Sequence, residues 1–180
     1  MAAMVKPALL VIDIQNAYLE SMANDNKEKA LLGINNFIGY FRAKGFPIVH
    51  IYHEDTEYGY GPKQGTEAFE FPKTIAIHPN DTKLIKHYGD AFNKTELDSV
   101  LKAKNVNTVF LCGLSATGCV MHTYVGAWNH DYKAFLLKGV LLSGDHEYTK
   151  CIENAFDAVS WMPLLRSEER RVGKECRSRW

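Results

Sequence analysis

The chain has 180 residues and equal numbers of basic and acidic side chains, so its formal net charge is zero. This length favours one domain with a substantial core. The balanced charge gives no indication of a nucleic acid or an anionic membrane as a partner. The apolar stretch nearest the N-terminus is too short to span a membrane, and no signal-peptide pattern precedes it. The four cysteines show no CxxC pair and no metal-ligand spacing, which indicates a reduced, cytoplasmic protein.

The last fourteen residues, 167–180, differ from the rest of the chain. Eight of them are charged, and they show no amphipathic period. The sequence RVGKECRSRW resembles vector-derived read-through sequence rather than part of a folded domain. We therefore expect one domain over residues 1–166 and a non-native or disordered tail over 167–180. A native basic tail is the alternative.

Strand and helix patterns alternate along the chain. Apolar runs predict strands at residues 8–14, 47–52, 82–86, 106–112 and 132–137, with 161–165 as a possible edge strand. Helical periodicity predicts helices at residues 28–42, 95–104, 119–129 and 146–159. Residues 53–80 read as a long loop that covers a site and holds at most one helical turn. This alternation predicts an α/β domain of three layers, with a mostly parallel sheet of about six strands between helices.

Three chemically useful side chains fall at equivalent points of this pattern. Asp13 ends the first strand, Lys86 ends the third, and Cys119 opens the helix after the fourth. The carboxyl ends of parallel strands share one edge of the sheet, where such folds bind their ligands. We therefore expect Asp13, Lys86 and Cys119 to lie close together.

These residue types suit acyl transfer to a thiol followed by hydrolysis of the thioester. Cys119 is expected on the first turn of a helix, where the helix dipole favours the thiolate. Asp13 could act as general base and then as general acid, with Lys86 as the compensating charge that keeps the thiolate poised. The N–H of Cys119 and one from the preceding turn could hold an oxyanion. The alternative is a buried Asp13–Lys86 ion pair beside an inert cysteine.

Local sequences around these residues resemble the isochorismatase-like cysteine hydrolase family. The matching segments are ALLVIDIQNAY with Asp13, KHYGDAF beginning at Lys86, Thr95-x-Leu97, and GLSATGCVMHT with Cys119. The resemblance covers about residues 8–165 and implies a Rossmann-like, isochorismatase-type fold with strand order 3-2-1-4-5-6. It also implies that Asp13, Lys86 and Cys119 form a catalytic triad.

Further properties follow from the resemblance alone. The Leu114–Ser115 peptide bond is expected to be cis, turning the Ser115 N–H towards the substrate oxygen beside that of Cys119. The cysteine points to hydrolysis of a small amide or carbamoyl C–N bond, without a cofactor, in a homodimer or homotetramer. Nicotinamidase relatives carry a metal motif of paired histidines, which this chain lacks. His53, Asp55 and His78 could in principle meet as ligands, but we expect no metal.

The substrate pocket is less readable from sequence. Tyr18, His53 and Trp128 are expected to bind substrate, and further candidates for its walls are Tyr58, Tyr60 and Tyr148. The body of the chain offers only Arg42 and Arg166 for clamping a carboxylate, so strongly anionic substrates are not favoured. The alternatives are a nicotinamidase with an atypical or absent metal site, and a catalytically silent or redox-sensing family member.

Overall fold

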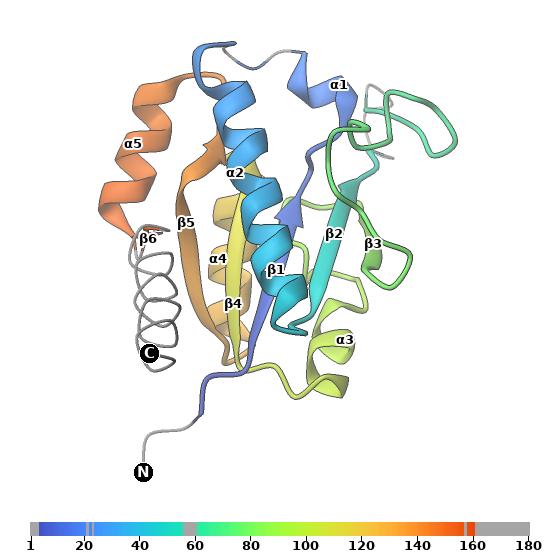
Figure 1. Ribbon diagram of the computed structural model, residues 1–180, viewed down its shortest axis with the longest axis vertical. Helices are drawn as coiled ribbons and strands as arrows, with labels where there is room; N and C mark the ends of the chain where they lie inside the picture. The colour runs from blue at the N-terminus through green and yellow to red at the C-terminus, as the bar shows by residue number, and fades with distance from the viewer. Residues whose placement is uncertain (1–3, 21, 23, 56–60, 157, 161–180) are drawn as a thin grey trace, which may run out of the picture.

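The computed structural model describes residues 4–20, 22, 24–55, 61–156 and 158–160, and its centre is a parallel sheet. Its strand order is β3-β2-β1-β4-β5-β6, which confirms the predicted fold class and order. The strands are β1 (Pro7–Ile12), β2 (Ile48–His53), β3 (Thr82–Lys86), β4 (Thr108–Leu114), β5 (Lys133–Leu142) and β6 (Ala158–Val159). The helices are α1 (Asn16–Leu19), α2 (Asn24–Ala43), α3 (Leu97–Ala103), α4 (Cys119–Asn129) and α5 (His146–Ala155). In Figure 1 the arrowheads of β1 and β2 point to the same end of the molecule.

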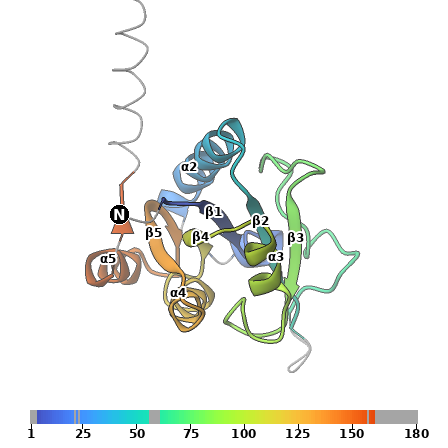
Figure 2. The same ribbon diagram turned by 90° about the horizontal axis from the view of Figure 1, so that it is seen from below.

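Helices cover both faces of the sheet, so the central strand β1 is buried on each side. Figure 2 shows α2 on one face and α3, α4 and α5 on the other. Alternate side chains of β1 divide between these layers, with Leu9 and Val11 in the cluster under α2 and Leu10 in the opposite cluster. This arrangement explains why the sequence of β1 is a continuous apolar run rather than an alternating one.

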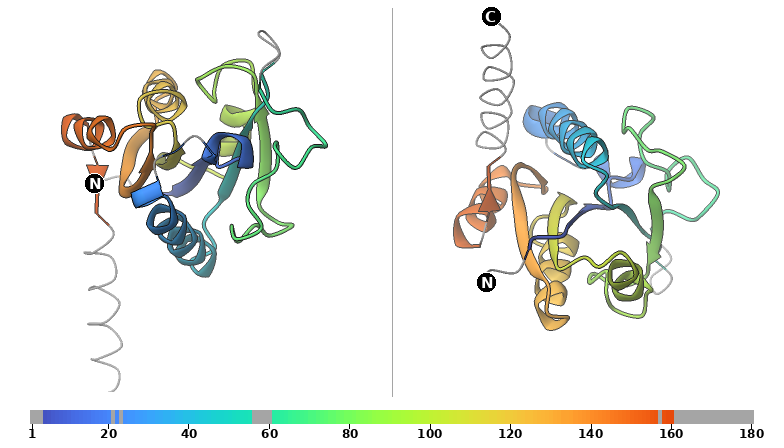
Figure 3. Two further views of the ribbon diagram at one scale, coloured as in Figure 1. Left: turned by 90° about the horizontal axis from the view of Figure 1, so that it is seen from above. Right: turned by 60° about the horizontal axis from the view of Figure 1, so that its bottom comes forward.

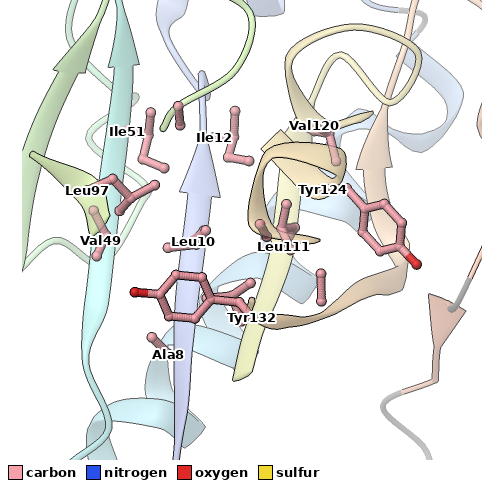
Figure 4. Packing of buried hydrophobic residues seen from close by; sticks show 14 of the residues in the cluster. Ala8, Leu10, Ile12, Val49, Ile51, Leu97, Leu111, Val120, Tyr124 and Tyr132 are labelled. Atoms are coloured by element: carbon pink, nitrogen blue, oxygen red, sulfur yellow. The ribbon is translucent and has the colours of Figure 1, made fainter. Parts of the chain in front are cut away.

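The apolar stripe of α2 is the largest helical contribution to its cluster. It consists of Ala30, Ile34, Phe37, Ile38 and Phe41, all buried. On the other face, shown in Figure 4, Leu97 of α3 and Val120 of α4 pack over Leu10 and Ile51 of the sheet. Each fully buried side chain of this size contributes about 1.5–3 kcal/mol of transfer free energy. Packing of α4 therefore fixes the position of its N-terminus, where Cys119 lies.

Two elements near the C-terminus differ from the sequence expectation. Helix α5 ends at Ala155 rather than continuing to residue 159, and β6 follows at once. Phe156 has an extended backbone and packs edge-on against Tyr124, so a tertiary contact ends the helix before its periodicity does. The edge strand expected at residues 161–165, and the tail at 167–180, lie outside the described residues.

Strand β5 is longer than its predicted range of 132–137. Its second half continues to Leu142 past Gly139, which has a φ of +81° and donates its N–H to Glu153. The register with β4 shifts between Leu111 and Gly113, which accommodates this irregularity. Lys138 and Gly139 are typical of a strand end, whereas Leu141 and Leu142 after them resume the pairing with β4.

The described part of the long loop, residues 61–81, contains no helix or strand and packs mainly beside α2 and β2. Phe69 and Phe71 stack on Tyr52, and Asn35 of α2 exchanges hydrogen bonds with the loop backbone. Figure 3 shows the loop on the side of the molecule that carries β2 and β3. The part of the loop around Phe69 and Phe71 thus covers the core, whereas residues 56–60 of the loop lie outside the described residues. None of the helices in the described ranges is long and apolar enough to cross a membrane.

Candidate functional site

Asp13, Lys86 and Cys119 meet at the carboxyl edge of the sheet, as their positions in the sequence suggested. Asp13 follows β1 directly, Lys86 is the last residue of β3, and Cys119 is the first residue of α4. The Lys86 Nζ lies 2.9 Å from Asp13 Oδ2. The thiol of Cys119 lies close enough to interact electrostatically with both of these groups. Topology alone has brought together residues that are far apart in the sequence.

The backbone at Asp13 holds its side chain at this edge. Asp13 has a φ of +53°, a left-handed conformation, and its N–H donates to Ile51 O. Next to it, a Cβ on Gly113 would lie 2.0 Å from Ile12 O, so β4 approaches β1 too closely there for any side chain. The left-handed φ of Asp13 therefore ends the extended backbone of β1. The hydrogen bond to β2 and the close approach of β4 fix the backbone at this point.

The Asp13–Lys86 pair is almost completely shielded from solvent. The Lys86 side chain is 0 % exposed and that of Asp13 is 2 % exposed. Lys86 also lies 3.2 Å from His53 Nδ1, and since an ammonium group can only donate, His53 Nδ1 must accept this hydrogen bond. The neutral His53 ring then carries its proton on Nε2. In the described part of the chain, Asp13 Oδ1 is buried and has no hydrogen-bond partner.

Gln15 is a supporting residue that the sequence interpretation missed. Its fully buried amide accepts from His53 N at 2.7 Å and donates to His53 O at 3.0 Å. This pair of hydrogen bonds ties the segment after β1 to the end of β2. A glutamine two residues after the aspartate was the available signal, but its partner could not be read from the sequence.

The turn between β4 and α4 supplies backbone donors beside Cys119. The Leu114–Ser115 peptide bond is cis. In the ranges that the structure describes, neither the Ser115 N–H nor the Cys119 N–H donates to a protein acceptor. The Ser115 carbonyl accepts instead from Gly118 and Val120, which closes the turn onto the first turn of α4. The geometry leaves these two donors available to a ligand oxygen.

Burial is the largest influence on the protonation of Cys119. Burial, reinforced by the negative charge of Asp13, raises the pKa of Cys119 to about 12, and the Lys86 ammonium only partly opposes this. Lys86 favours the thiolate as expected, but in the ligand-free protein burial outweighs its effect. Cys119 is a thiol at neutral pH and needs a base when it reacts. Burial and the Lys86 charge also lower the pKa of His53, which stays neutral.

A cavity of about 440 Å³ opens above these groups. Its lining consists of Asp13, Tyr18, Met22, His53, Asp55, Gly61, Leu114, Ser115 and Cys119. Tyr18 and His53 therefore lie where the sequence interpretation placed them. Met22 and Gly61 were missed, and Asp55 had been considered only as a metal ligand.

The remaining pocket candidates do not reach this cavity. Trp128 lies in the last turn of α4, at the opposite end from Cys119, and is 49 % exposed with its ring against Tyr124. Tyr148 on α5 is 60 % exposed. The helical rise of about 1.5 Å per residue places Trp128 far along the helix axis from Cys119 and from the sheet edge, a distance that the sequence interpretation overlooked. Tyr58 and Tyr60 lie outside the described residues.

The metal ligands considered from sequence do not assemble. His78 lines a different cavity, together with Arg42 and Asp81, whereas His53 and Asp55 line the one above Cys119. The cluster that could hold a metal in the described ranges is Asp13, His53 and Cys119, whose ligand atoms lie within 4.8 Å of one another. However, the Lys86 ammonium already bonds to both Asp13 and His53, so a cation there would face a like charge. These residues do not fit a resident metal.

The sheet order and the three converging side chains define an α/β protein with a cysteine-centred site at the carboxyl edge of its sheet. The family model of the Isochorismatase domain matches residues 7–161. The chain therefore belongs to the isochorismatase family, which confirms the resemblance noted in its sequence.

Individual relatives are consistent with this assignment. The chain is similar to the uncharacterized isochorismatase family protein YddQ of Bacillus subtilis, with 31% identity over 128 residues that cover 69% of this chain and 71% of YddQ. It is 26% identical to maleamate amidohydrolase of Pseudomonas putida over 172 residues, covering 86% of this chain and 80% of that protein. Among solved structures, N-carbamoylsarcosine amidase from Thermoplasma acidophilum superposes with a TM-score of 0.76 and 27% identity, covering 87% of this chain and 95% of that one. The family thus contains amidohydrolases.

Proposed function

We propose that the protein is a cysteine-dependent hydrolase that cleaves the C–N bond of a small amide or carbamoyl compound through a thioester on Cys119. The observation that carries this proposal is the convergence of Cys119 with the buried Asp13–Lys86 pair at one cavity. A cavity of about 440 Å³ suits a small molecule. The amidohydrolase names among the relatives support the same reaction class.

The first half-reaction forms the thioester. Asp13 accepts the Cys119 proton through Oδ1, the carboxylate oxygen that has no partner in the described part of the chain. The sulfur attacks the carbonyl carbon at the same time, so no stable thiolate is required at neutral pH. The carbonyl oxygen becomes an oxyanion, and the N–H groups of Ser115 and Cys119 are its donors. When the intermediate collapses, the C–N bond breaks and Asp13 returns the proton to the departing nitrogen.

The second half-reaction releases the acid. Asp13 accepts a proton from water while the water oxygen attacks the thioester carbonyl, and the same two N–H groups bind the oxyanion. The C–S bond then breaks, and Asp13 gives its proton to the Cys119 sulfur. Amide and water are thereby converted to carboxylic acid and ammonia, and every protein group returns to its initial state. The role of Lys86 is electrostatic, because its ammonium neutralises Asp13 whenever that carboxylate is charged.

Ammonia release from a panel of primary amides, with nicotinamide included, tests this proposal. The wild type should release ammonia from at least one amide, and Cys119→Ala should reduce that rate at least about a thousandfold. Cys151→Ala is the matched control, because Cys151 is exposed on α5 and should leave the rate unchanged. Trapped thioester should appear by mass spectrometry as an acyl adduct on Cys119. Equal turnover by Cys119→Ala, or no turnover of any amide, would overturn the hydrolase proposal.

A further inference from the structure

We propose that His53 selects amides that carry a hydrogen-bond acceptor beside the scissile carbonyl, because it presents one uncharged N–H donor to the cavity. This inference deepens the proposed function and rests on it for the reaction at that carbonyl. The substrate class that follows is a small amide with a second carbonyl group, an ether oxygen or an unprotonated ring nitrogen within a few bonds of the amide. His53 then recognises a part of the molecule that takes no part in bond cleavage.

The buried contact with Lys86 fixes the protonation of the His53 ring. Lys86 Nζ lies 2.9 Å from Asp13 Oδ2 and 3.2 Å from His53 Nδ1. An ammonium group can only donate, so Nδ1 is the acceptor and carries no proton. Burial and the positive charge of Lys86 lower the pKa of His53, so a second proton on the ring is disfavoured as well. The neutral ring therefore has its one proton on Nε2.

The Nε2 atom of His53 faces the cavity rather than a protein acceptor. His53 is part of the cavity lining, and within the described ranges its ring forms its hydrogen bond through Nδ1. Nε2 is not among the enclosed polar atoms of the described chain that lack a partner, so it is accessible from the cavity. One ring nitrogen lies within 4.8 Å of both the Cys119 sulfur and an Asp13 carboxylate oxygen. A ligand with its carbonyl carbon at the sulfur therefore has atoms a few bonds away that can reach Nε2.

The backbone of His53 is held as firmly as its ring. The fully buried Gln15 amide accepts from His53 N at 2.7 Å and donates to His53 O at 3.0 Å. His53 is also the last residue of β2, where it pairs with Lys86 of β3. A donor held by these contacts loses little conformational freedom when a ligand binds, so it discriminates between ligands better than a mobile side chain would.

A fixed donor in a partly buried site favours ligands that can accept its hydrogen bond. The hydrogen bond between neutral groups, together with the cost of leaving the donor against a CH₂ group, favours an acceptor-bearing ligand about five- to tenfold. An ammonium substituent has donors only and cannot pair with Nε2–H. The scissile oxygen itself is assigned to the N–H groups of Ser115 and Cys119, so the atom that pairs with His53 is a second acceptor.

Two pairs of amides of matched length measure this preference. 3-Oxobutanamide and 4-oxopentanamide each carry a second carbonyl group, whereas butanamide and pentanamide have a CH₂ group in its place. The wild type should hydrolyse at least one oxo-amide with a kcat/KM about five- to tenfold above that of its partner. Equal values in both pairs would overturn the inference. Because a ketone also activates the amide electronically, the decisive quantity is the change in this ratio when His53 is replaced.

His53→Asn separates the two functions of the ring. Its amide oxygen can take the place of Nδ1 and accept from Lys86, but the shorter side chain has no donor at the position of Nε2. The ratio of oxo-amide to plain amide should therefore fall about five- to tenfold. His53→Gln, whose longer side chain can place an N–H near the position of Nε2, should retain part of the preference.

His122→Asn is the matched control, because His122 is exposed on α4 and is not part of the cavity lining. It should leave the ratio at the wild-type value. An equal loss of kcat/KM for oxo-amides and plain amides in His53→Asn would show that His53 acts on the scissile group or only on the fold. That result would overturn the inference.

Two measurements do not depend on turnover. A long-range proton–nitrogen NMR spectrum at neutral pH should show His53 with Nε2 protonated and Nδ1 unprotonated, with its signals identified by their loss in His53→Asn; a proton on Nδ1 would overturn the inference. Protection of Cys119 from iodoacetamide, followed by peptide mass spectrometry, measures the binding of each amide. If no amide is hydrolysed but oxo-amides protect better and His53→Asn removes the difference, the hydrolase proposal fails and the role of His53 stands. If no amide is hydrolysed and protection does not distinguish the oxo-amides, both proposals fail.

Discussion

Removing either partner of the Asp13–Lys86 pair should destabilise the protein strongly, and removing both should cost much less than the sum. With both side chains buried, Lys86→Met leaves the Asp13 carboxylate without its counter-charge. Loss of one partner of a buried ion pair typically costs about 3–5 kcal/mol. Asp13 Oδ1 has no hydrogen-bond partner in the described ranges, so little else compensates the stranded charge. Against a typical domain stability of about 5–15 kcal/mol, the effect should be large but measurable.

The double variant Asp13→Asn, Lys86→Met has no uncompensated charge at this position. We expect a coupling free energy of at least about 2 kcal/mol between the two substitutions. Urea unfolding followed by circular dichroism gives the four free energies of unfolding that the cycle needs. The control cycle, Glu147→Gln with Lys150→Met, removes a solvent-exposed ion pair of α5 and should show a coupling below about 1 kcal/mol. Additivity of the two buried substitutions within about 0.5 kcal/mol would refute the reasoning.

Two further predictions concern the protonation of Cys119 and the backbone contact beside Asp13. Because the pKa of Cys119 is raised to about 12, its thiolate fraction should grow tenfold per pH unit throughout the neutral and mildly alkaline range. Its alkylation rate should therefore still be rising at about pH 10, where a small free thiol with the usual pKa of about 8.5 has levelled off; an early plateau at Cys119 would show that burial does not dominate. Gly113→Ala should lower the free energy of unfolding by about 3 kcal/mol or more, because the new Cβ would overlap Ile12 O at a φ of +116°. Gly39→Ala is its control, since that helical position has open space and should gain about 0.5–1 kcal/mol in the same urea titration.

Most of the fold could be predicted from the apolar runs in the sequence and from the topology of parallel sheets. Strand β1 is apolar throughout because helices cover it on both faces, and such a run is recognisable without any structure. The parallel order then places the residues that end β1, β3 and β4 at one edge of the sheet. The meeting of Asp13, Lys86 and Cys119 followed from these two facts. Their catalytic roles remain proposals.

What the sequence could not supply depends on contacts between distant segments. The Gln15 amide holds the backbone of His53, and Asp55 lines the cavity, yet neither has a local pattern that distinguishes it from an ordinary polar residue. The pKa of Cys119 was misjudged for the same reason, because the depth of burial is a property of the packed chain and not of one helix terminus. The error at Trp128 was of another kind, because its distance from Cys119 along the helix follows from the helical rise of about 1.5 Å per residue.

The left-handed backbone of Asp13 restricts which mutations this position can accept during evolution. Aspartate and asparagine adopt positive φ more readily than other residues with a side chain, whereas glutamate lacks the short polar group that stabilises it. A longer carboxylate is therefore disfavoured by the backbone before its reach toward Cys119 is even considered. Asparagine fits the same conformation, and its codons differ from those of aspartate by one base. That single substitution would nevertheless leave the buried Lys86 ammonium without its counter-charge, so a descendant that loses its base at position 13 retains its stability only if Lys86 is replaced as well.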